Sequence, residues 1–232
     1  MRSMLSSAVV LRRRAALWVA GLLLAGGIVA TPCVRAGQEP SVRLLADFND
    51  PARNAARRDD LDGPYQAWML NPECRCVQTL VADDALGIPG GQALQLDFAV
   101  TCPPYFNGWF MFLSPEPQGA MDWTAYDRLG FFMRGNSGFA LELKDLTSKD
   151  DGSPKGVAQY TLTRVSARWQ QVEVPFSSFV PKSKTPIEWG AIRQLVIVFS
   201  DLKSSAAGQV AIDRIYVSKG PAAFPAANAA AP

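Results

Sequence analysis

Hydrophobic residues recur mostly at every second position from Ser41 onward, and Gly, Pro, Asn and Asp lie between the hydrophobic runs. This alternation is typical of β-strands joined by turns. It predicts strands over residues 42–48, 92–100, 109–113, 128–134, 139–145, 157–163, 169–175, 194–199 and 209–217. Strands at this spacing predict an all-β fold, a two-sheet β-sandwich.

The same alternation assigns a face to each strand. Leu94, Leu96 and Phe98 share one side of their strand, and Asp97 lies on the other. Strands of this kind bury one face and leave the other in water. Residues 195–199 are apolar throughout, so we expect that strand to be covered on both faces.

Three irregular stretches separate the strands, at residues 49–67, 102–108 and 147–156. Each is long enough to shape one rim of a groove. The chain ends in a segment that is nearly all Ala, Pro and Gly over residues 219–232. That composition predicts a disordered tail.

The N-terminus has the three parts of a secretory signal peptide. Four arginines and no acids occur before residue 15, an apolar run follows over residues 15–30, and a small-residue site ends at Ala36. The apolar run is short for a membrane span, which needs about 20 residues. We therefore expect cleavage near Ala36 and a periplasmic or secreted protein. An uncleaved anchor and a mitochondrial presequence are the alternatives.

Cleavage changes the charge of the chain. Residues 1–36 contain five arginines and no acids, so the 23 basic and 21 acidic residues become 18 and 21, a net charge of −3. A mildly acidic protein without a basic run is a poor candidate for binding nucleic acid, because phosphates are neutralised by Lys and Arg. The sequence from residue 37 onward contains no apolar segment long enough to predict a membrane span.

Three cysteines remain after cleavage: Cys74, Cys76 and Cys102. In an oxidising compartment we expect one disulfide, joining Cys102 to either Cys74 or Cys76. A metal site is the alternative interpretation. The chain has no histidine, and three thiols make an incomplete zinc set.

The absence of histidine also excludes Ser-His-Asp and Cys-His catalysis. A two-carboxylate glycosidase needs only Asp or Glu, which Asp59, Asp60, Asp62, Asp150 and Asp151 would supply. These residues lie in turn-rich loops, where solvated surface is the commoner explanation. We therefore expect a protein that is not an enzyme, with no catalytic residues.

Six segments, taken in order, carry a resemblance to a known family. They are LADFND (45–50), GQALQL (91–96), DWTAYDRLGFFMRG (122–135), FALELKD (139–145), WQQVEVPF (169–176) and VAIDRIYV (210–217). Their order and spacing resemble the galactose-binding-like jelly-roll superfamily, notably carbohydrate-binding modules of family 11 and the complex I intermediate-associated protein 30 domain. The resemblance implies a two-sheet jelly-roll β-sandwich over residues 37–218.

The resemblance also implies a function without catalysis. Domains of this type bind a polysaccharide or oligosaccharide on a concave sheet face, where aromatic rings stack on sugars and polar side chains bind hydroxyls. The alternative is an assembly factor that binds an envelope protein on the same fold, since fold does not fix function.

Two groups of residues are candidates for such a binding face. The first points away from the expected core, and a solvated face with an Arg134–Glu142 ion pair is its alternative interpretation. Its members are Asp97, Phe132, Arg134, Glu142, Lys144 and Gln159. The second consists of aromatic residues in or beside loops: Tyr65, Trp68, Tyr105, Phe106 and Trp109.

Related modules hold a structural calcium between the first and last strands. The resemblance implies Asp47, Asn49, Asp50 and Asp213 as its ligands, and calcium requires six to eight oxygens. Asn49 stands where many relatives have Glu, which lowers the negative charge of the set. Hydrogen bonds that cap turns are the alternative role for these residues.

Overall fold

The computed structural model describes residues 41–82, 91–116, 119–149 and 153–224. The predicted signal peptide, residues 1–36, and the end of the predicted tail, residues 225–232, lie outside the described residues. In the described part of the chain, none of the helices combines the length and the hydrophobicity that crossing a bilayer requires.

One antiparallel sheet is built around the last strand, and we call it the β12 sheet. Along one edge of β12 lies β6, with β9 outside it, while β4 and β1 share the other edge and β3 lies outside β4. Its strands are β1 (Val42–Ala46), β3 (Cys76–Ala82), β4 (Gln92–Ala99), β6 (Arg128–Gly135), β9 (Gln170–Pro175) and β12 (Ala207–Ser218).

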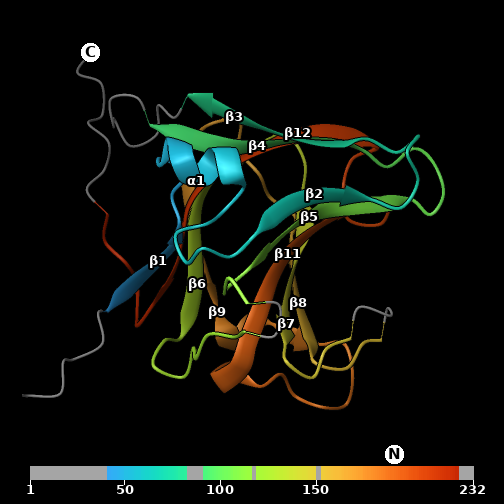
Figure 1. The fold of residues 1–232 in the computed structure, drawn as a ribbon. Helices are drawn as coiled ribbons and strands as arrows, with labels where there is room; N and C mark the ends of the chain where they lie inside the picture. The colour runs from blue at the N-terminus through green and yellow to red at the C-terminus, as the bar shows by residue number, and fades with distance from the viewer. Residues whose placement is uncertain (1–40, 83–90, 117–118, 150–152, 225–232) are drawn as a thin grey trace, which may run out of the picture. The chain divides into compact units, whose positions relative to one another are not determined.

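The other antiparallel sheet, the β11 sheet, has the strand order β10-β8-β7-β11-β5-β2. Figure 1 shows the two sheets as separate layers. The strands of the β11 sheet are β2 (Tyr65–Met69), β5 (Phe106–Phe112), β7 (Phe139–Asp145), β8 (Val157–Leu162), β10 (Val180–Pro181) and β11 (Ile192–Ser200). This architecture confirms the predicted all-β jelly-roll sandwich. The strands β2, β3 and β10 are additional to those that the alternation predicted.

The core lies between the two sheets and contains the residues that the alternation assigned to it. Leu94, Leu96 and Phe98 of β4 are buried. They meet the inner face of the β11 sheet, where Phe98 stacks on Phe199 with ring centroids 3.8 Å apart. Burial of this apolar surface is the main term that stabilises such a sandwich.

Residues 49–67 were expected to be irregular, and this prediction is wrong in two places. A short helix, α1 (Pro51–Ala56), and the start of β2 lie within them. The helix forms because the Asp50 carboxylate accepts from the Ala52 and Arg53 amides and Pro51 opens the first turn. Two 3₁₀ turns complete the described helices: η1 (Phe176–Ser178) and η2 (Trp189–Ala191).

The predicted disordered tail starts at Lys219, yet its first six residues make defined contacts. The Ala222 amide donates to Glu173 Oε1 over 2.7 Å. The Phe224 ring packs on Phe132 and Tyr216, with centroids 5.6 and 4.7 Å away. Residues 219–224 therefore cover part of the outer face of the β12 sheet.

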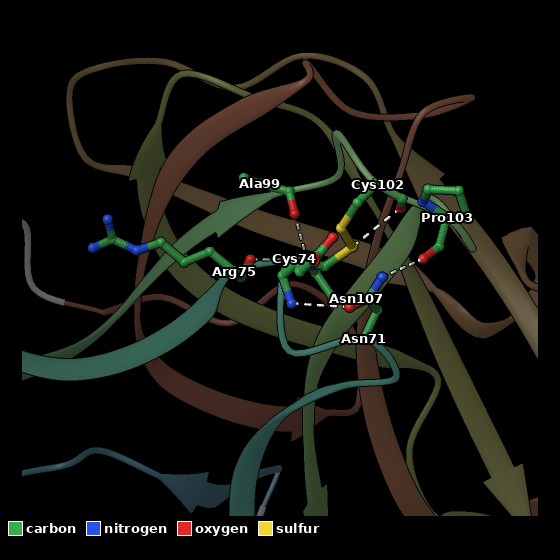
Figure 2. The surroundings of a disulfide bond; sticks show 8 residues. Asn71, Cys74, Arg75, Ala99, Cys102, Pro103 and Asn107 are labelled. Carbon is green, nitrogen blue, oxygen red and sulfur yellow. Dashed lines mark hydrogen bonds between the residues drawn. A yellow bond between two sulfur atoms is a disulfide. The ribbon is translucent and has the colours of Figure 1, made fainter.

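A disulfide joins Cys74 to Cys102 (Figure 2), which confirms a bond between Cys102 and one of the two expected partners. It links the loop after β2 to the loop after β4. Among the cysteines that the structure describes, Cys76 is the free one; it is buried, and burial raises its pKa to about 12.

Amide side chains reinforce the same loops. Asn71 Nδ2 donates to the Pro103 carbonyl over 3.1 Å. Asn107 Nδ2 donates to the carbonyls of Arg75 and Ala99 over 2.8 and 2.7 Å. The two loops are therefore fixed to each other by covalent and hydrogen bonds.

We expect the pair of substitutions Cys74→Ser and Cys102→Ser to lower the free energy of unfolding by about 3 kcal/mol, because the loop closed by the bond is no longer constrained in the unfolded chain. Urea denaturation followed by tryptophan fluorescence measures this change. A reducing agent should destabilise the wild type similarly and leave the double variant unchanged. A wild type whose midpoint does not respond to reductant would contradict the prediction.

Candidate functional site

A groove of about 860 Å³ lies over the outer face of the β11 sheet. Side chains from five strands of that sheet form it, together with the loops that follow β2, β4, β7, β10 and β11. It is lined by Trp68, Leu70, Pro104, Tyr105, Phe106, Phe110, Phe112, Glu142, Lys144, Lys149, Ser153, Pro154, Val157, Gln159, Lys182, Gln194, Val196, Val198, Ser200, Asp201, Leu202 and Lys203.

Aromatic rings from β2 and β5 form one wall of the groove. In β5, Trp109 and Met111 point into the core and are fully buried. Because successive side chains alternate across a strand, Phe106, Phe110 and Phe112 point the other way, into the groove. The Phe110 and Phe112 rings contact edge to face, with centroids 5.4 Å apart.

Gly108 lets the Trp68 indole approach this wall. Trp68 pairs with Gly108 across β2 and β5, and a Cβ at position 108 would lie 3.1 Å from Trp68 Nε1 and would collide with the Ile197 carbonyl oxygen. With no side chain there, the indole reaches Phe106, and the ring centroids are 5.8 Å apart.

The central strand β11 supplies the floor. Val196 pairs with Phe110 on one side and with Glu142 on the other, and Glu142 pairs with Gln159 of β8. One row across four strands therefore passes from an aromatic ring through an aliphatic side chain to a carboxylate and an amide. Residues 195–199 were expected to be covered on both faces; Leu195, Ile197 and Phe199 lie in the core, and Val196 and Val198 line the groove.

On the opposite side, a polar wall is formed by side chains that hydrogen bonds connect to one another: Glu142, Gln159, Lys182 and Lys203. Glu142 Oε1 accepts from Lys182 Nζ over 2.8 Å and from Gln159 Nε2 over 2.9 Å. Gln159 Oε1 accepts from Lys203 Nζ over 2.6 Å. The network fixes the direction of the Gln159 amide, because its NH₂ group is held by the carboxylate.

Gln194 occupies the floor between Phe112 and Lys144, which are its neighbours in the register. Only 5% of it is exposed, and its Oε1 has no hydrogen-bond partner among the described residues. A buried carbonyl oxygen without a partner is costly.

The structure brings six of the predicted ligand-binding residues together in the groove: Trp68, Tyr105, Phe106, Glu142, Lys144 and Gln159. Tyr65 and Trp109 do not line it, because they are 2% and 0% exposed and belong to the core. They had been placed in or beside loops, but each lies within a strand on its inward side.

Asp97, Phe132 and Arg134 lie on the β12 sheet and not in the groove. Gln209 Nε2 donates to Asp97 over 2.8 Å, and the Arg134 guanidinium lies 5.0 Å from the Trp169 ring centroid. The predicted single polar surface is therefore wrong, because its residues belong to two different sheets. The Arg134–Glu142 pair is excluded for the same reason.

The sequence prediction missed several groove residues. If Trp109 had been assigned to the core, the alternation along β5 would have predicted that Phe110 and Phe112 point outward, into the groove. Lys182 and Lys203 follow β10 and β11 in loops, where no periodicity assigns a direction.

The calcium ligands implied by the resemblance have other roles. Asp47 Oδ1 accepts from the Asn49 amide over 3.0 Å, Asn49 Oδ1 accepts from the Gln92 amide over 2.9 Å, and Asp50 caps α1. Asp213 is buried in β12. In the described ranges there is no group of three or more acidic or cysteine residues arranged to hold a metal. The four residues as arranged do not fit a calcium site.

The carboxylates considered for a glycosidase hold their own loop. Asp59 Oδ1 accepts from the Leu61 and Gly63 amides over 2.9 and 2.7 Å, and burial raises the Asp59 pKa to about 7. Asp62 accepts from Arg53 Nη1 over 2.7 Å. Asp150 and Asp151 lie outside the described residues.

Comparison with known proteins gives a family match. The family described as carbohydrate binding domain (family 11) matches residues 47–191. No curated protein matches the chain.

Three solved structures share the fold. A family 11 carbohydrate-binding module from Clostridium thermocellum, in complex with a β-1,3-1,4-mixed-linked tetrasaccharide, is 17% identical, covers 77% of this chain and 95% of its own, and has a TM-score of 0.52. The family 11 module of a cellulosomal cellulase from the same organism is 18% identical, covers 79% of this chain and 98% of its own, and has a TM-score of 0.52. An exo-β-agarase is 13% identical, with 78% of this chain and 25% of its own covered and a TM-score of 0.50.

We expect Gln194→Leu to raise the free energy of unfolding by about 1 kcal/mol, because it removes a buried oxygen without a partner. The matched control is Gln159→Leu, which should lower it by about 1 kcal/mol, because this amide is hydrogen-bonded at both ends. Chemical denaturation of both variants measures the difference. Equal destabilisation by the two changes would show that the Gln194 oxygen is not an unpaired group.

Proposed function

Because the chain belongs to the carbohydrate-binding domains of family 11, we propose that it binds a polysaccharide or oligosaccharide, without catalysis, in the groove over the β11 sheet. The observation that carries this proposal is the division of the groove into an aromatic wall and a polar wall. A pyranose ring has apolar C–H faces and polar hydroxyls at its edge, so it needs both kinds of surface at once.

The two walls are arranged so that one glycan chain can meet both. Phe110, Val196 and Glu142 lie in one row on adjacent strands, and neighbouring strands are about 4.8 Å apart. The Glu142 carboxylate is therefore two strand spacings from Phe110 and the Gln159 amide three, so an oligosaccharide that lies across the strands contacts both walls.

The family match favours a glycan over the alternative partner, an envelope protein. The tetrasaccharide bound to the similar module is mixed-linked β-glucan, which makes this polymer a natural first probe. Its binding to the present chain is part of the proposal.

We expect Trp68→Ala and Phe110→Ala each to weaken glycan binding about tenfold, because each removes a stacking surface from the aromatic wall. Affinity gel electrophoresis against a panel of soluble polysaccharides, including mixed-linked β-glucan, measures this effect. Trp169→Ala is the matched control, since Trp169 lies beside Arg134 of the β12 sheet, and its binding should equal the wild type. Failure of the wild type to bind any glycan would overturn the proposal.

Export to the periplasm or medium is the second part of the proposal. It is supported by the order of basic, apolar and small residues before Gly37. The Cys74–Cys102 disulfide also supports it, because such bonds persist in oxidising compartments.

We expect the exported protein to begin at Gly37. Intact-mass spectrometry of the chain expressed with its own N-terminus and recovered from periplasm and medium checks this. A chain retained in the membrane with Met1 present would instead favour the uncleaved anchor.

A further inference from the structure

The described residues that line the groove carry an excess of positive charge. Among them, four of the seven lysines of the chain stand beside two carboxylates: Lys144, Lys149, Lys182 and Lys203 with Glu142 and Asp201. The chain from Gly37 onward has a net charge of −3. The positive charge is therefore local to the groove and does not reflect the composition of the protein.

The hydrogen-bond network of the polar wall separates the lysines into two roles. Lys182 forms an ion pair with Glu142, with 2.8 Å between Nζ and Oε1. Lys203 Nζ donates to Gln159 Oε1, a neutral oxygen. The Glu142 charge is thus shared with Lys182, while the direct partner of Lys203 carries no charge.

The position of Lys203 makes its own positive charge energetically unfavourable when no ligand is bound. Partial burial lowers the Lys203 pKa, the positive charge of Lys182 lowers it further, and Glu142 opposes the change. An ammonium group has three N–H donors, and the bond to Gln159 uses one of them. An anion placed against Lys203 would relieve both the desolvation and the repulsion from Lys182.

Lys203 is also close to the aromatic wall along the chain and in space. It lies in the turn after β11, where the Asp201 amide donates to the Tyr105 carbonyl over 3.2 Å. Ser200, at the end of β11, pairs with Phe106. The turn that carries the ammonium is therefore attached to the strand end that carries two of the aromatic rings.

From this juxtaposition, and resting on the proposed function, we infer that the groove is selective for acidic glycans, in which a pyranose stacked on Tyr105 or Phe106 presents an anionic substituent to Lys203. Carboxylate and sulfate share the chemistry that an ammonium recognises. Lys182 adds a second positive charge beside the anion, and Gln159 keeps Lys203 in place.

The test uses the full chain and three polymers in affinity electrophoresis and calorimetry: polygalacturonate for carboxylate, dextran sulfate for sulfate, and mixed-linked β-glucan as the neutral glycan. We expect at least one acidic polymer to bind about tenfold more tightly than the neutral one. The substitution Lys203→Met should remove that preference, with a loss of affinity about tenfold larger for the acidic polymer than for the neutral one, because it keeps the aliphatic stem and removes the charge.

Two control variants accompany it. Lys203→Arg retains the charge and should retain the preference. Lys219→Met removes an exposed lysine that lies 3.8 Å from Asp127, away from the groove, and should behave as the wild type. Thermal unfolding of every variant confirms that it is folded before its binding is compared.

The outcomes separate this inference from the proposed function. Equal affinity for neutral and acidic polymers, or an equal loss of both on Lys203→Met, overturns the inference and leaves glycan binding in place. Acidic binding that neither Tyr105→Ala nor Phe106→Ala weakens also overturns it, because the attraction would then be unspecific charge. Absence of binding to all three polymers, with no other glycan bound, overturns the proposed function itself.

Discussion

The position of Trp109 in the core determines the chemistry of the opposite face. A strand side chain cannot turn inward without sending its two neighbours outward. With Trp109 and Met111 anchored between the sheets, Phe106, Phe110 and Phe112 must face outward. The same rule acts in β11, where Leu195, Ile197 and Phe199 fill the core and Val196 lies in the groove floor. The aromatic wall is therefore a consequence of how the core is packed.

This arrangement has a cost in the free protein. The aromatic wall is only partly buried, and the Gln194 oxygen has no partner among the described residues. Both features would be removed by substitutions that improve the stability of the fold. Their presence in one groove is the pattern expected where a binding site is maintained at the expense of stability. The disulfide and the Asn107 bonds act in the opposite direction, since they hold the rim loop before a ligand arrives.

Local alternation was sufficient to predict most strands and their inward faces, because the period of two is a property of each strand alone. It did not show which strands share a sheet, since that depends on contacts between residues distant in the sequence. Phe132 and Glu142 are ten positions apart along the chain, yet they belong to opposite layers of the sandwich. The helix α1 was predictable in principle, because Asp50 followed by Pro51 is a capping signal. The groove lysines were not, because Lys182 and Lys203 reach it from turns whose direction depends on the assembled sheet.

The two outer faces of the sandwich differ in what covers their aromatic and polar groups. Phe132 lies on the outer face of the β12 sheet, but Phe224 packs against it and Ala222 is hydrogen-bonded to Glu173 of the same face. A segment of the chain itself therefore meets the stacking and hydrogen-bonding groups there. On the β11 sheet the corresponding aromatic and polar groups line a groove of about 860 Å³. The same pairing of ring and hydrogen-bonding group that fixes residues 219–224 on one face is thus available to a sugar on the other.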